Sequence, residues 1–493
     1  MKKYFLMLFI FLRLYPCFSQ GYNHQWLLGS YNFFQDPKGR MLFNQSGYSL
    51  INENRKMVFK GTEGNISDAN GNLLMSSNGI WIANALNDTM QNGSGLNPSI
   101  LASNWPFGFP LNFGNVFLPF PNDSNKYVLI HKTAFDVFAD SPKAIYKSLI
   151  DIALDSVIEK NDTLLIDTLS WGIGSCKHAN GRDWWIFVMR DYNPIAYTFL
   201  LTPNGIDTIF TQTIGFTANT IGNVSGIVFS QDGTKMIYST PISQSPNGTL
   251  LISDFDRCSG LFSNTQAIPI TSNEYLFGLA FSPSGNYAYT CSSNYIFQIN
   301  VSSLQVDTVA MYDGFISPPT SWCCATTFFG MYLAANGKIY VTSGSGVQHL
   351  HEINYPDSAG ITCDVQQHSI NLGYAQLRAV PNHPNYYLGC DTTLGCLCLI
   401  PNAIEESVTH NFNVKIFPNP SDGNFSISYL LPQNHKGKLE IFDIEGRKVY
   451  NQNLSQWSTL QFLNLQILSN GVYVVKLSSD NYSETKKLSI QKE

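Results

Sequence analysis

Charged residues are scarce in this chain, because Asp, Glu, Lys and Arg make up only 13% of its 493 residues. Surface helices of soluble proteins are rich in Glu, Lys and Ala, so this scarcity argues against a mainly helical fold. No long segment with helical periodicity of apolar residues follows the N-terminus. The sequence instead has 37 Gly, many Asn and 13% aromatic residues, which is typical of short strands joined by tight turns.

Positive charge is also in short supply, since the formal net charge is −6. Proteins that bind nucleic acid need clustered Lys and Arg to contact phosphates. The composition therefore argues against a nucleic-acid partner, and it equally disfavours an anionic membrane surface.

Motifs of common catalytic and cofactor sites are missing. There is no G-x-x-x-x-G-K-[S/T] loop and no G-x-S-x-G nucleophile motif. His349 and His351 would share one face of a strand, but no third metal ligand is identifiable, so packed histidines are the simpler interpretation. The segment that begins at Asp68 resembles the start of a calcium loop but lacks its later carboxylates. We therefore predict no catalytic residue, no cofactor and no metal site.

Two aromatic stretches could bind a ligand, but packing explains both of them. Trp184 and Trp185 are neighbours, so on a strand they face opposite ways and only one could line a given groove. Residues 104–121 are rich in Trp, Phe and Pro. We interpret the tryptophans as packed between sheets and residues 104–121 as a cap over one end of the fold.

The first 20 residues, MKKYFLMLFIFLRLYPCFSQ, resemble an export signal. Two lysines precede the apolar residues 4–14, and Pro16 breaks the helix before a short polar end. The apolar run is too short for a comfortable membrane span, and Arg13 interrupts it. We predict a cleaved signal peptide over residues 1–20. A lipoprotein signal at Cys17 is the alternative, although it would require small residues directly before the cysteine.

The cysteine count is consistent with export. Ten cysteines become nine without the leader, so at least one has no partner within the mature chain. Cys390, Cys396 and Cys398 cluster near the end of the main domain, where a disulfide would tie that end down. Cys323 and Cys324 are adjacent, and neighbouring strand residues point to opposite faces, so we expect no bond between them.

A hairpin pattern recurs at a fixed spacing along the main part of the chain. Three copies read GIVFSQDGTKMIYST (226–240), GLAFSPSGNYAYTCS (278–292) and GMYLAANGKIYVTSG (330–344). Each has an apolar strand, a polar turn with a glycine and a second alternating strand. The glycines supply the positive φ that such turns require. Weaker copies extend the pattern, and the predicted turn positions are Gly71, Ser124, Gly181, Gly233, Gly285, Gly337 and Asn385.

A fixed period of about 50 residues made of strands predicts a β-propeller. A single four-stranded blade cannot bury both of its faces, whereas blades stacked radially cover one another. We predict a seven-bladed propeller over residues 21–401, with the strands around Ser49–Phe59 completing the last blade and closing the ring. The alternative from the residues alone is one or more β-sandwiches with ordinary hairpins.

The segment FSPSGNYAYTCSSNYIFQINV resembles the repeats of WD40-like and similar propellers, in which the first strand ends in S-P-D-G. Residues 282–285 and 230–233 are the nearest matches to that turn. The full Gly-His…Trp-Asp pattern is missing, so the resemblance does not extend to standard WD40 proteins.

The composition changes after Pro401. Residues 402–411 are polar and acidic and read as a linker. Residues 412–493 contain alternating segments such as Phe425, Ile427 and Tyr429, which predict about seven short strands in a small immunoglobulin-like β-sandwich.

This C-terminal region resembles the type A sorting domain of type IX secretion, a family identified by F-P-N-P, D-x-x-G-R and G-x-Y motifs and a basic end. The residues that carry the resemblance are Phe417, Pro418, Asn419, Pro420, Gly423, Phe425, Asp443, Gly446, Arg447, Gly471, Tyr473, Lys486 and Lys487. The resemblance implies that the outer-membrane translocon and sorting machinery read this domain. It also implies passage through the periplasm and the outer membrane, with the cargo then secreted or attached to the cell surface.

Together these patterns predict a non-catalytic binding or adhesion protein with an unknown extracellular protein or glycan as its ligand. The strands IVFS, LAFS and MYLA, expected to be innermost, carry almost no ionisable residues, which disfavours a catalytic centre there. The alternative is a secreted glycan hydrolase or lyase on a propeller scaffold, because propellers also host such sites. A structural matrix component is a third possibility.

Overall fold

The structure is a computed structural model in which the prediction of an all-β fold is confirmed. Among the residues it describes, helix is limited to α1 (Ile100–Asn104) and the 3-10 turn η1 (Gly360–Cys363). No helix in this described part is long and apolar enough to cross a membrane. The described residues are 21–492, without 31–36, 45–46, 135–141, 192, 215–225, 241–246, 273, 319–323, 395, 397, 399–411, 432–434, 456–457 and 480–481. The predicted signal peptide and linker lie outside them.

The main part of the chain consists of consecutive antiparallel sheets. The first sheet has three strands, β1 (Gln25–Leu28), β2 (Lys38–Asn44) and β3 (Gly47–Glu53). Two four-stranded meanders follow: β4 (Gly64–Ser67), β5 (Leu73–Ser77), β6 (Trp81–Asn84) and β7 (Thr89–Ser94), then β8 (Asn115–Pro119), β9 (Lys126–Thr133), β10 (Ala144–Asp151) and β11 (Ser156–Ile166). Their outer strands β7 and β11 pair in parallel, which joins the two meanders into one eight-stranded sheet.

Four further four-stranded meanders complete this part of the chain. The first two are β12 (Gly174–Lys177), β13 (Trp184–Met189), β14 (Ile195–Thr202) and β15 (Gly205–Thr213), then β16 (Ile227–Phe229), β17 (Lys235–Thr240), β18 (Asn247–Asp256) and β19 (Leu261–Thr271). The last two are β20 (Leu279–Phe281), β21 (Tyr287–Cys291), β22 (Tyr295–Asn300) and β23 (Val306–Met311), then β24 (Phe328–Leu333), β25 (Ile339–Ser343), β26 (Val347–Ile353) and β27 (Val365–Gln376).

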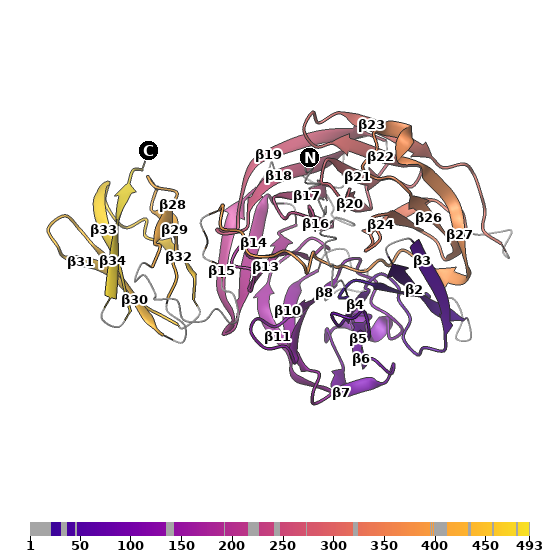
Figure 1. Cartoon of the computed structure of the whole chain (residues 1–493), viewed down its shortest axis with the longest axis horizontal. Helices are drawn as coiled ribbons and strands as arrows, with labels where there is room; N and C mark the ends of the chain where they lie inside the picture. The colour runs from indigo at the N-terminus through magenta and orange to yellow at the C-terminus, as the bar shows by residue number, and fades with distance from the viewer. Residues whose placement is uncertain are drawn as a thin grey trace, which may run out of the picture.

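The sheets are arranged around a common centre, with the first strand of each meander innermost (Figure 1). Neighbouring first strands contact each other, as in β4 with β8 and β16 with β20. Among these first strands β8, β16, β20 and β24 are mainly apolar, whereas β4 and β12 also carry polar residues. The N-terminal sheet packs against the last meander, where the rings of Phe43 and Tyr340 lie 5.4 Å apart.

Each predicted turn glycine joins the first and second strands of a meander. The φ angles of Gly71, Gly181, Gly233, Gly285 and Gly337 are 86°, 77°, 71°, 75° and 79°. A side chain would be strained at these angles, and at Gly181 a Cβ would also lie 2.8 Å from the backbone nitrogen of Cys390.

Two details of the predicted ring are wrong. The segment around Ser49–Phe59 does not complete the last sheet, because β3 forms the outer strand of the separate N-terminal sheet. The residues around Asn385 form no hairpin, and the described residues between 377 and 398 contain no strand. Pro381 and Pro384 are the physical reason, since proline cannot donate a backbone hydrogen bond within a sheet.

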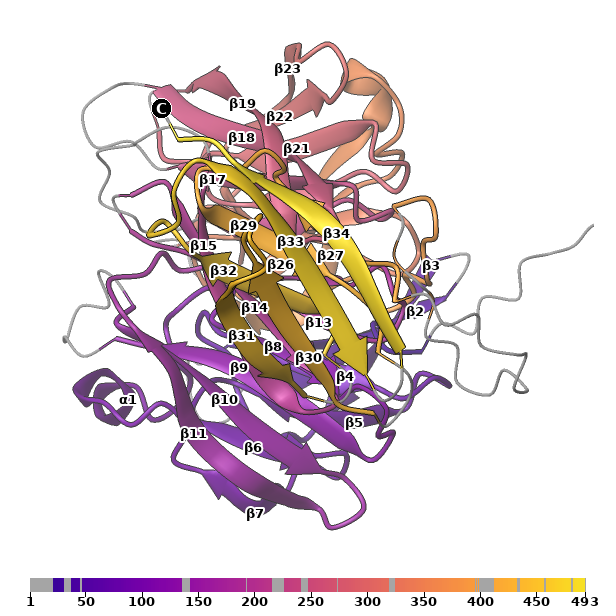
Figure 2. The ribbon, with the colours of Figure 1, turned by 90° about the vertical axis from the view of Figure 1, so that its left-hand side faces the viewer.

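The C-terminal region forms two sheets that face each other (Figure 2). One contains β28 (Lys415–Phe417), β29 (Asn424–Ser428) and β32 (Leu460–Asn464); the other contains β30 (Gly437–Phe442), β31 (Lys448–Leu454), β33 (Gly471–Ser479) and β34 (Tyr482–Ile490). Alternate residues of these strands point inward and form one core, including the fully buried Ile427, Leu439, Ile441, Val475, Leu477 and Leu488. Phe462 of β32 stacks on Phe210 of β15, which connects this region to the ring of sheets.

Candidate functional site

A segment after β27 crosses the centre of the ring, and we call residues 378–390 the central strap (Figure 1). Asn382 donates hydrogen bonds to the carbonyls of Asn115 and Ile173, at 3.2 and 2.8 Å. Asn385 donates to the carbonyl of Gln231 at 2.6 Å. Because these carbonyls belong to three different meanders, the strap connects the inner strands across the centre.

Tyr386 is the main apolar anchor of the strap. Its side chain is buried, and its hydroxyl donates to the carbonyl of Phe117 at 2.9 Å. Its ring centroid lies 5.8 Å from Trp184, edge to face, and 5.4 Å from Tyr22. One side chain of the strap therefore packs against several sheets at once.

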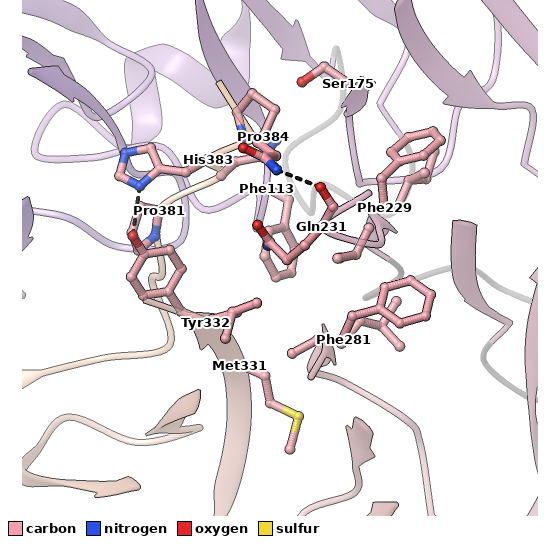
Figure 3. Close-up of a pocket in the computed structure, with 17 residues that line it drawn as sticks. Phe113, Ser175, Phe229, Gln231, Phe281, Met331, Tyr332, Pro381, His383 and Pro384 are labelled. Carbon is pink, nitrogen blue, oxygen red and sulfur yellow. Dashed lines mark hydrogen bonds between the residues drawn. The ribbon is translucent and has the colours of Figure 1, made fainter. Parts of the chain in front are cut away.

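A cavity of about 70 Å³ lies between the strap and the inner strands (Figure 3). It is lined mainly by apolar side chains of β16, β20 and β24 and by strap residues 381–385. Phe113, from the aromatic stretch expected to cap the fold, also lines it. A cavity of this size holds a few water molecules rather than a saccharide.

The titratable side chains that line this cavity are His383 and Tyr332, and they form a hydrogen bond with each other. Tyr332 donates its hydroxyl proton to Nδ1 of His383 at 2.9 Å, and Nε2 of His383 donates to the Asn65 carbonyl at 2.9 Å. Burial lowers the pKa of His383 to about 4 and raises the pKa of Tyr332. Both side chains are therefore neutral at pH 7, with both nitrogens of His383 already occupied.

Glu63 is a buried carboxyl close to the same region. Its oxygens accept hydrogen bonds from the Trp26 indole at 2.8 Å and from the Asn65 amide at 3.1 Å. Desolvation raises the pKa of Glu63 to about 8, so the group is mostly protonated at neutral pH. Its side chain is fully buried and links β1 to β4, which is a structural rather than a catalytic position.

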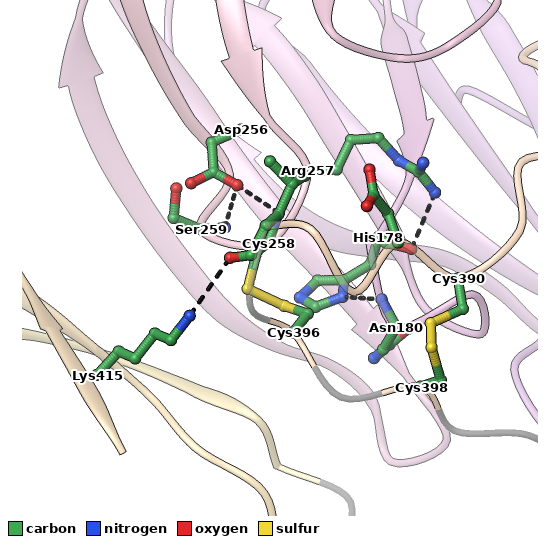
Figure 4. The surroundings of a disulfide bond; sticks show 12 residues. His178, Asn180, Asp256, Arg257, Cys258, Ser259, Cys390, Cys396, Cys398 and Lys415 are labelled. Atoms are coloured by element: carbon green, nitrogen blue, oxygen red, sulfur yellow. Dashed lines mark hydrogen bonds between the residues drawn. A yellow bond between two sulfur atoms is a disulfide. The ribbon is translucent and has the colours of Figure 1, made fainter. Parts of the chain in front are cut away.

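Disulfides hold the far end of the strap (Figure 4). Cys258, in the turn between β18 and β19, bonds Cys396, and Cys390 bonds Cys398. The buried Arg257 donates to the carbonyl of Gly389 at 2.6 Å, beside these bonds. The predicted cysteine cluster therefore does tie down the end of the main domain.

The remaining described cysteines differ in state. Cys176, Cys291 and Cys363 are buried free thiols, and burial raises the pKa of each. Cys324 is disulfide-bonded. The expectation for Cys323 lies outside the described residues.

An open polar groove of about 660 Å³ lies between the turn after β16 and the turn after β20. It is lined largely by hydroxyl, amide and carboxyl groups, including Ser230, Asp232, Thr234, Asn286, Asn300 and Asp357, together with Tyr287. The carboxylate of Asp357 accepts from the backbone nitrogen of Ser284 at 3.1 Å. Asp232 accepts from Thr234 at 3.0 Å. The groove thus presents hydrogen-bonding groups to solvent beside one aromatic ring.

The other candidate ligand residues are involved in local packing. His349 Nδ1 lies 2.9 Å from the Ser317 hydroxyl, and His351 Nδ1 accepts from the backbone nitrogen of His368 at 3.0 Å. Within the described ranges, no three His, Cys, Asp or Glu side chains are placed to hold a metal ion.

The interpretation of the remaining motifs as packed or turn residues agrees with their surroundings. The side chains of Trp184 and Trp185 are both buried. Asp68 accepts from the backbone nitrogens of Asn70 and Asn72, at 2.8 and 2.9 Å, and so stabilises the β4–β5 turn.

In the C-terminal region, the F-P-N-P motif lies against β34. The peptide bonds before Pro418 and Pro420 are cis. Asn419 donates from Nδ2 to the Lys487 carbonyl at 2.7 Å, and its Oδ1 accepts from the Ser489 nitrogen at 2.8 Å. The structure therefore brings this motif together with the basic end, which lies 68 residues further along the chain.

The D-x-x-G-R motif forms the turn between β30 and β31. Asp443 accepts from the backbone nitrogen of Arg447 at 2.9 Å and from its Nε at 2.8 Å, and these hydrogen bonds lower the pKa of Asp443. Gly446 has φ 78°.

Three other motif residues shape the core and the tight turns of this region. Phe425 and Tyr473 are buried in the core. Gly423 has φ 107°, and a Cβ there would lie 2.8 Å from the Gln466 Cα. The motif residues thus hold turns and core, whereas Lys486 and Lys487 are exposed on β34.

Comparison with known proteins confirms the C-terminal resemblance. Residues 415–491 match the family described as "Secretion system C-terminal sorting domain". This tail indicates export to the cell surface or the extracellular space. No curated protein matches the chain.

Several solved structures resemble all or part of this chain weakly. A periplasmic gluconolactonase of Pseudomonas aeruginosa is 11% identical, with a TM-score of 0.34, and the match covers 90% of this chain and 99% of that one. An oligogalacturonate lyase in complex with manganese is 13% identical, with a TM-score of 0.36, covering 66% and 85%. Hydrazine synthase of Kuenenia stuttgartiensis is 12% identical, with a TM-score of 0.34, covering 60% and 76%. Similarity at this level carries no argument about activity.

Proposed function

We propose that this chain is a non-catalytic binding or adhesion protein that the type IX secretion system delivers to the cell surface or the medium. In this proposal residues 1–20 are a cleaved signal peptide and residues 21–401 form a seven-bladed β-propeller. Residues 402–411 are a linker, and residues 412–493 are an immunoglobulin-like sorting domain. The match of residues 415–491 to the sorting family supports the route of export.

The central strap is the observation that supports a non-catalytic role. The centre of a propeller is a usual place for an enzyme site, but here the chain's own residues occupy it. The cavity that remains is small, and His383, which lines it, is uncharged at neutral pH and has both nitrogens occupied. General acid–base chemistry on a glycan needs accessible carboxyl groups, which this lining lacks.

The polar groove between the β16 and β20 turns is the surface we propose for ligand binding. Its hydroxyl and amide groups can donate and accept hydrogen bonds, and Tyr287 adds an aromatic ring. Such a surface suits a neutral, hydroxyl-rich glycan or a polar protein loop better than a nucleic acid.

Export is tested by comparing the full chain with a chain that ends at residue 411, both produced in a host with type IX secretion. We expect the full chain outside the cell without either end, and the truncated chain in the periplasm. A finer test uses Asn419→Ala, which removes both contacts of this side chain to β34, with the exposed Asn451→Ala as its control. Equal export of the truncated chain would refute the proposed route.

The enzyme alternative predicts a different result. A glycan hydrolase would release reducing ends from polysaccharides, and a lyase would produce unsaturated, ultraviolet-absorbing ends. We expect neither product from the purified full chain. Either product, if abolished by Asp232→Asn or Asp357→Asn, would place a catalytic site in the polar groove.

A further inference from the structure

The N-terminal sheet has three strands, whereas each of the described meanders after it has four. Among the described strands its outer strand β3 pairs only with β2, so within the described ranges one edge of β3 has no strand beside it. Leu50 and Ile51, in the middle of β3, are 39% and 41% exposed. A free strand edge carries backbone N–H and C=O groups that can pair with another strand.

The other outer strands of the ring are irregular in ways that β3 is not. The outer strands β7 and β11 pair with each other, and register shifts interrupt the pairing of β15, β19, β23 and β27 with their neighbours. Pro269 lies within β19, and His368 and Gly373 of β27 have positive φ. Such bulges and prolines protect sheet edges from unwanted pairing.

Strand β3, by contrast, is regular along its whole length. Its pairing with β2 runs from Glu53 to Gly47 without a shift. Its sequence, GYSLINE, has no proline or lysine. The charge of Glu53 is balanced by Arg55, at 2.7 Å, and by Arg40. The edge of β3 is therefore regular and carries no unpaired charge along the residues available for pairing.

No described strand of the C-terminal half pairs with this edge. Cys398 is bonded to Cys390 beside the β12–β13 turn, and Phe412 lies in the core of the sorting domain. The sorting domain lies beyond β15, on the opposite side of the ring from β3 (Figure 1). The proposed leader, residues 1–20, is removed on export. A second molecule of this chain can supply the missing strand.

We propose that β3 pairs antiparallel with β3 of a second copy of this chain, across a twofold axis, to form a continuous six-stranded sheet. A twofold contact uses the same surface on both copies, and β3 is self-complementary in this sense. Pairing centred on Leu50 sets Leu50 against Leu50 and Glu53 against Gly47, so no like charges face each other. The contact is small, so the dimer forms in a concentration-dependent equilibrium.

Sedimentation of the exported chain over a wide concentration range tests the proposal. We expect the mass to rise toward twice that of one chain, and Ile51→Lys to keep it monomeric. Ile158→Lys is the matched control, because Ile158 is also 41% exposed but lies on the irregular strand β11. This control should dimerise like the wild type.

A second measurement tests the register. Leu50→Cys should form a covalent dimer on oxidation with diamide, whereas Ile158→Cys should not. A wild-type chain that stays monomeric over the whole concentration range would refute the proposal. The β3 edge would then be free to pair only with a strand of a different protein. Dimerisation that Ile51→Lys does not affect, or failure of Leu50→Cys to crosslink, would equally refute pairing through β3.

Discussion

Replacing Tyr386 tests whether the central strap is held mainly by burial of its aromatic ring. The ring contacts Trp184 and Tyr22, and the hydroxyl makes one hydrogen bond, to the Phe117 carbonyl. We expect Tyr386→Ala to destabilise the protein strongly and to free the strap, and Tyr386→Phe to have a small effect. The pair of variants separates the ring from the hydroxyl.

The two magnitudes differ enough to be measured. A buried aromatic side chain removes about 150–250 Å² from water, and at about 25 cal/mol per Å² this corresponds to roughly 4–6 kcal/mol. Aromatic-to-alanine changes in cores typically cost about 3–5 kcal/mol. Loss of the hydroxyl removes one neutral hydrogen bond, worth about 1 kcal/mol. The loss of unfolding free energy caused by Tyr386→Ala should therefore be about four times the loss caused by Tyr386→Phe.

The assay is urea unfolding followed by tryptophan fluorescence, together with limited proteolysis of the native protein. We expect new cleavage within residues 378–390 for Tyr386→Ala only. If both variants lose the same stability, the hydroxyl rather than the ring anchors the strap. If Tyr386→Ala leaves stability and cleavage unchanged, the strap is not held by this side chain.

Two further perturbations address the Cys258–Cys396 disulfide and the buried carboxyl of Glu63. Cys258→Ser should lower the melting temperature, because the disulfide closes a loop with a sequence separation of 138. The lost chain entropy of the unfolded state corresponds to a stabilisation of about 5 kcal/mol for a loop of this length. A variant that melts like the oxidised wild type would contradict this. Glu63 has its folded-state pKa raised to about 8, so its stabilising effect is complete below the unfolded value near 4.5 and is lost as the pH rises through 8. Between pH 5 and pH 9 the wild type should lose up to roughly 4 kcal/mol of unfolding free energy through this group. Glu63→Gln should not show this loss, so its melting temperature should decline less over the same range. Parallel pH curves for wild type and variant would show that Glu63 is not the titrating group.

Local patterns in the sequence were sufficient for most of the strands and their turns, the hairpin predicted around Asn385 excepted. Alternation of apolar residues has the period of a strand, so Tyr473, Val475 and Leu477 could be assigned to a core face without further information. A glycine with positive φ is a local requirement of a tight turn, which is why Gly233 and Gly285 marked the hairpins at a regular spacing. The sorting motif was equally readable, because its residues occur in a fixed order along the chain.

Tertiary structure alone decided which distant segments meet. The path of the strap through the centre, the bond from Cys258 to Cys396 and the contact of Asn419 with β34 all join residues far apart in sequence, and no local pattern encodes such pairings. Pro381 and Pro384 did argue against a strand near Asn385, but not for a route across the ring. Whether β3 completes the last sheet or remains an open edge depends on how the two ends of the ring pack, which involves the whole domain rather than any one segment.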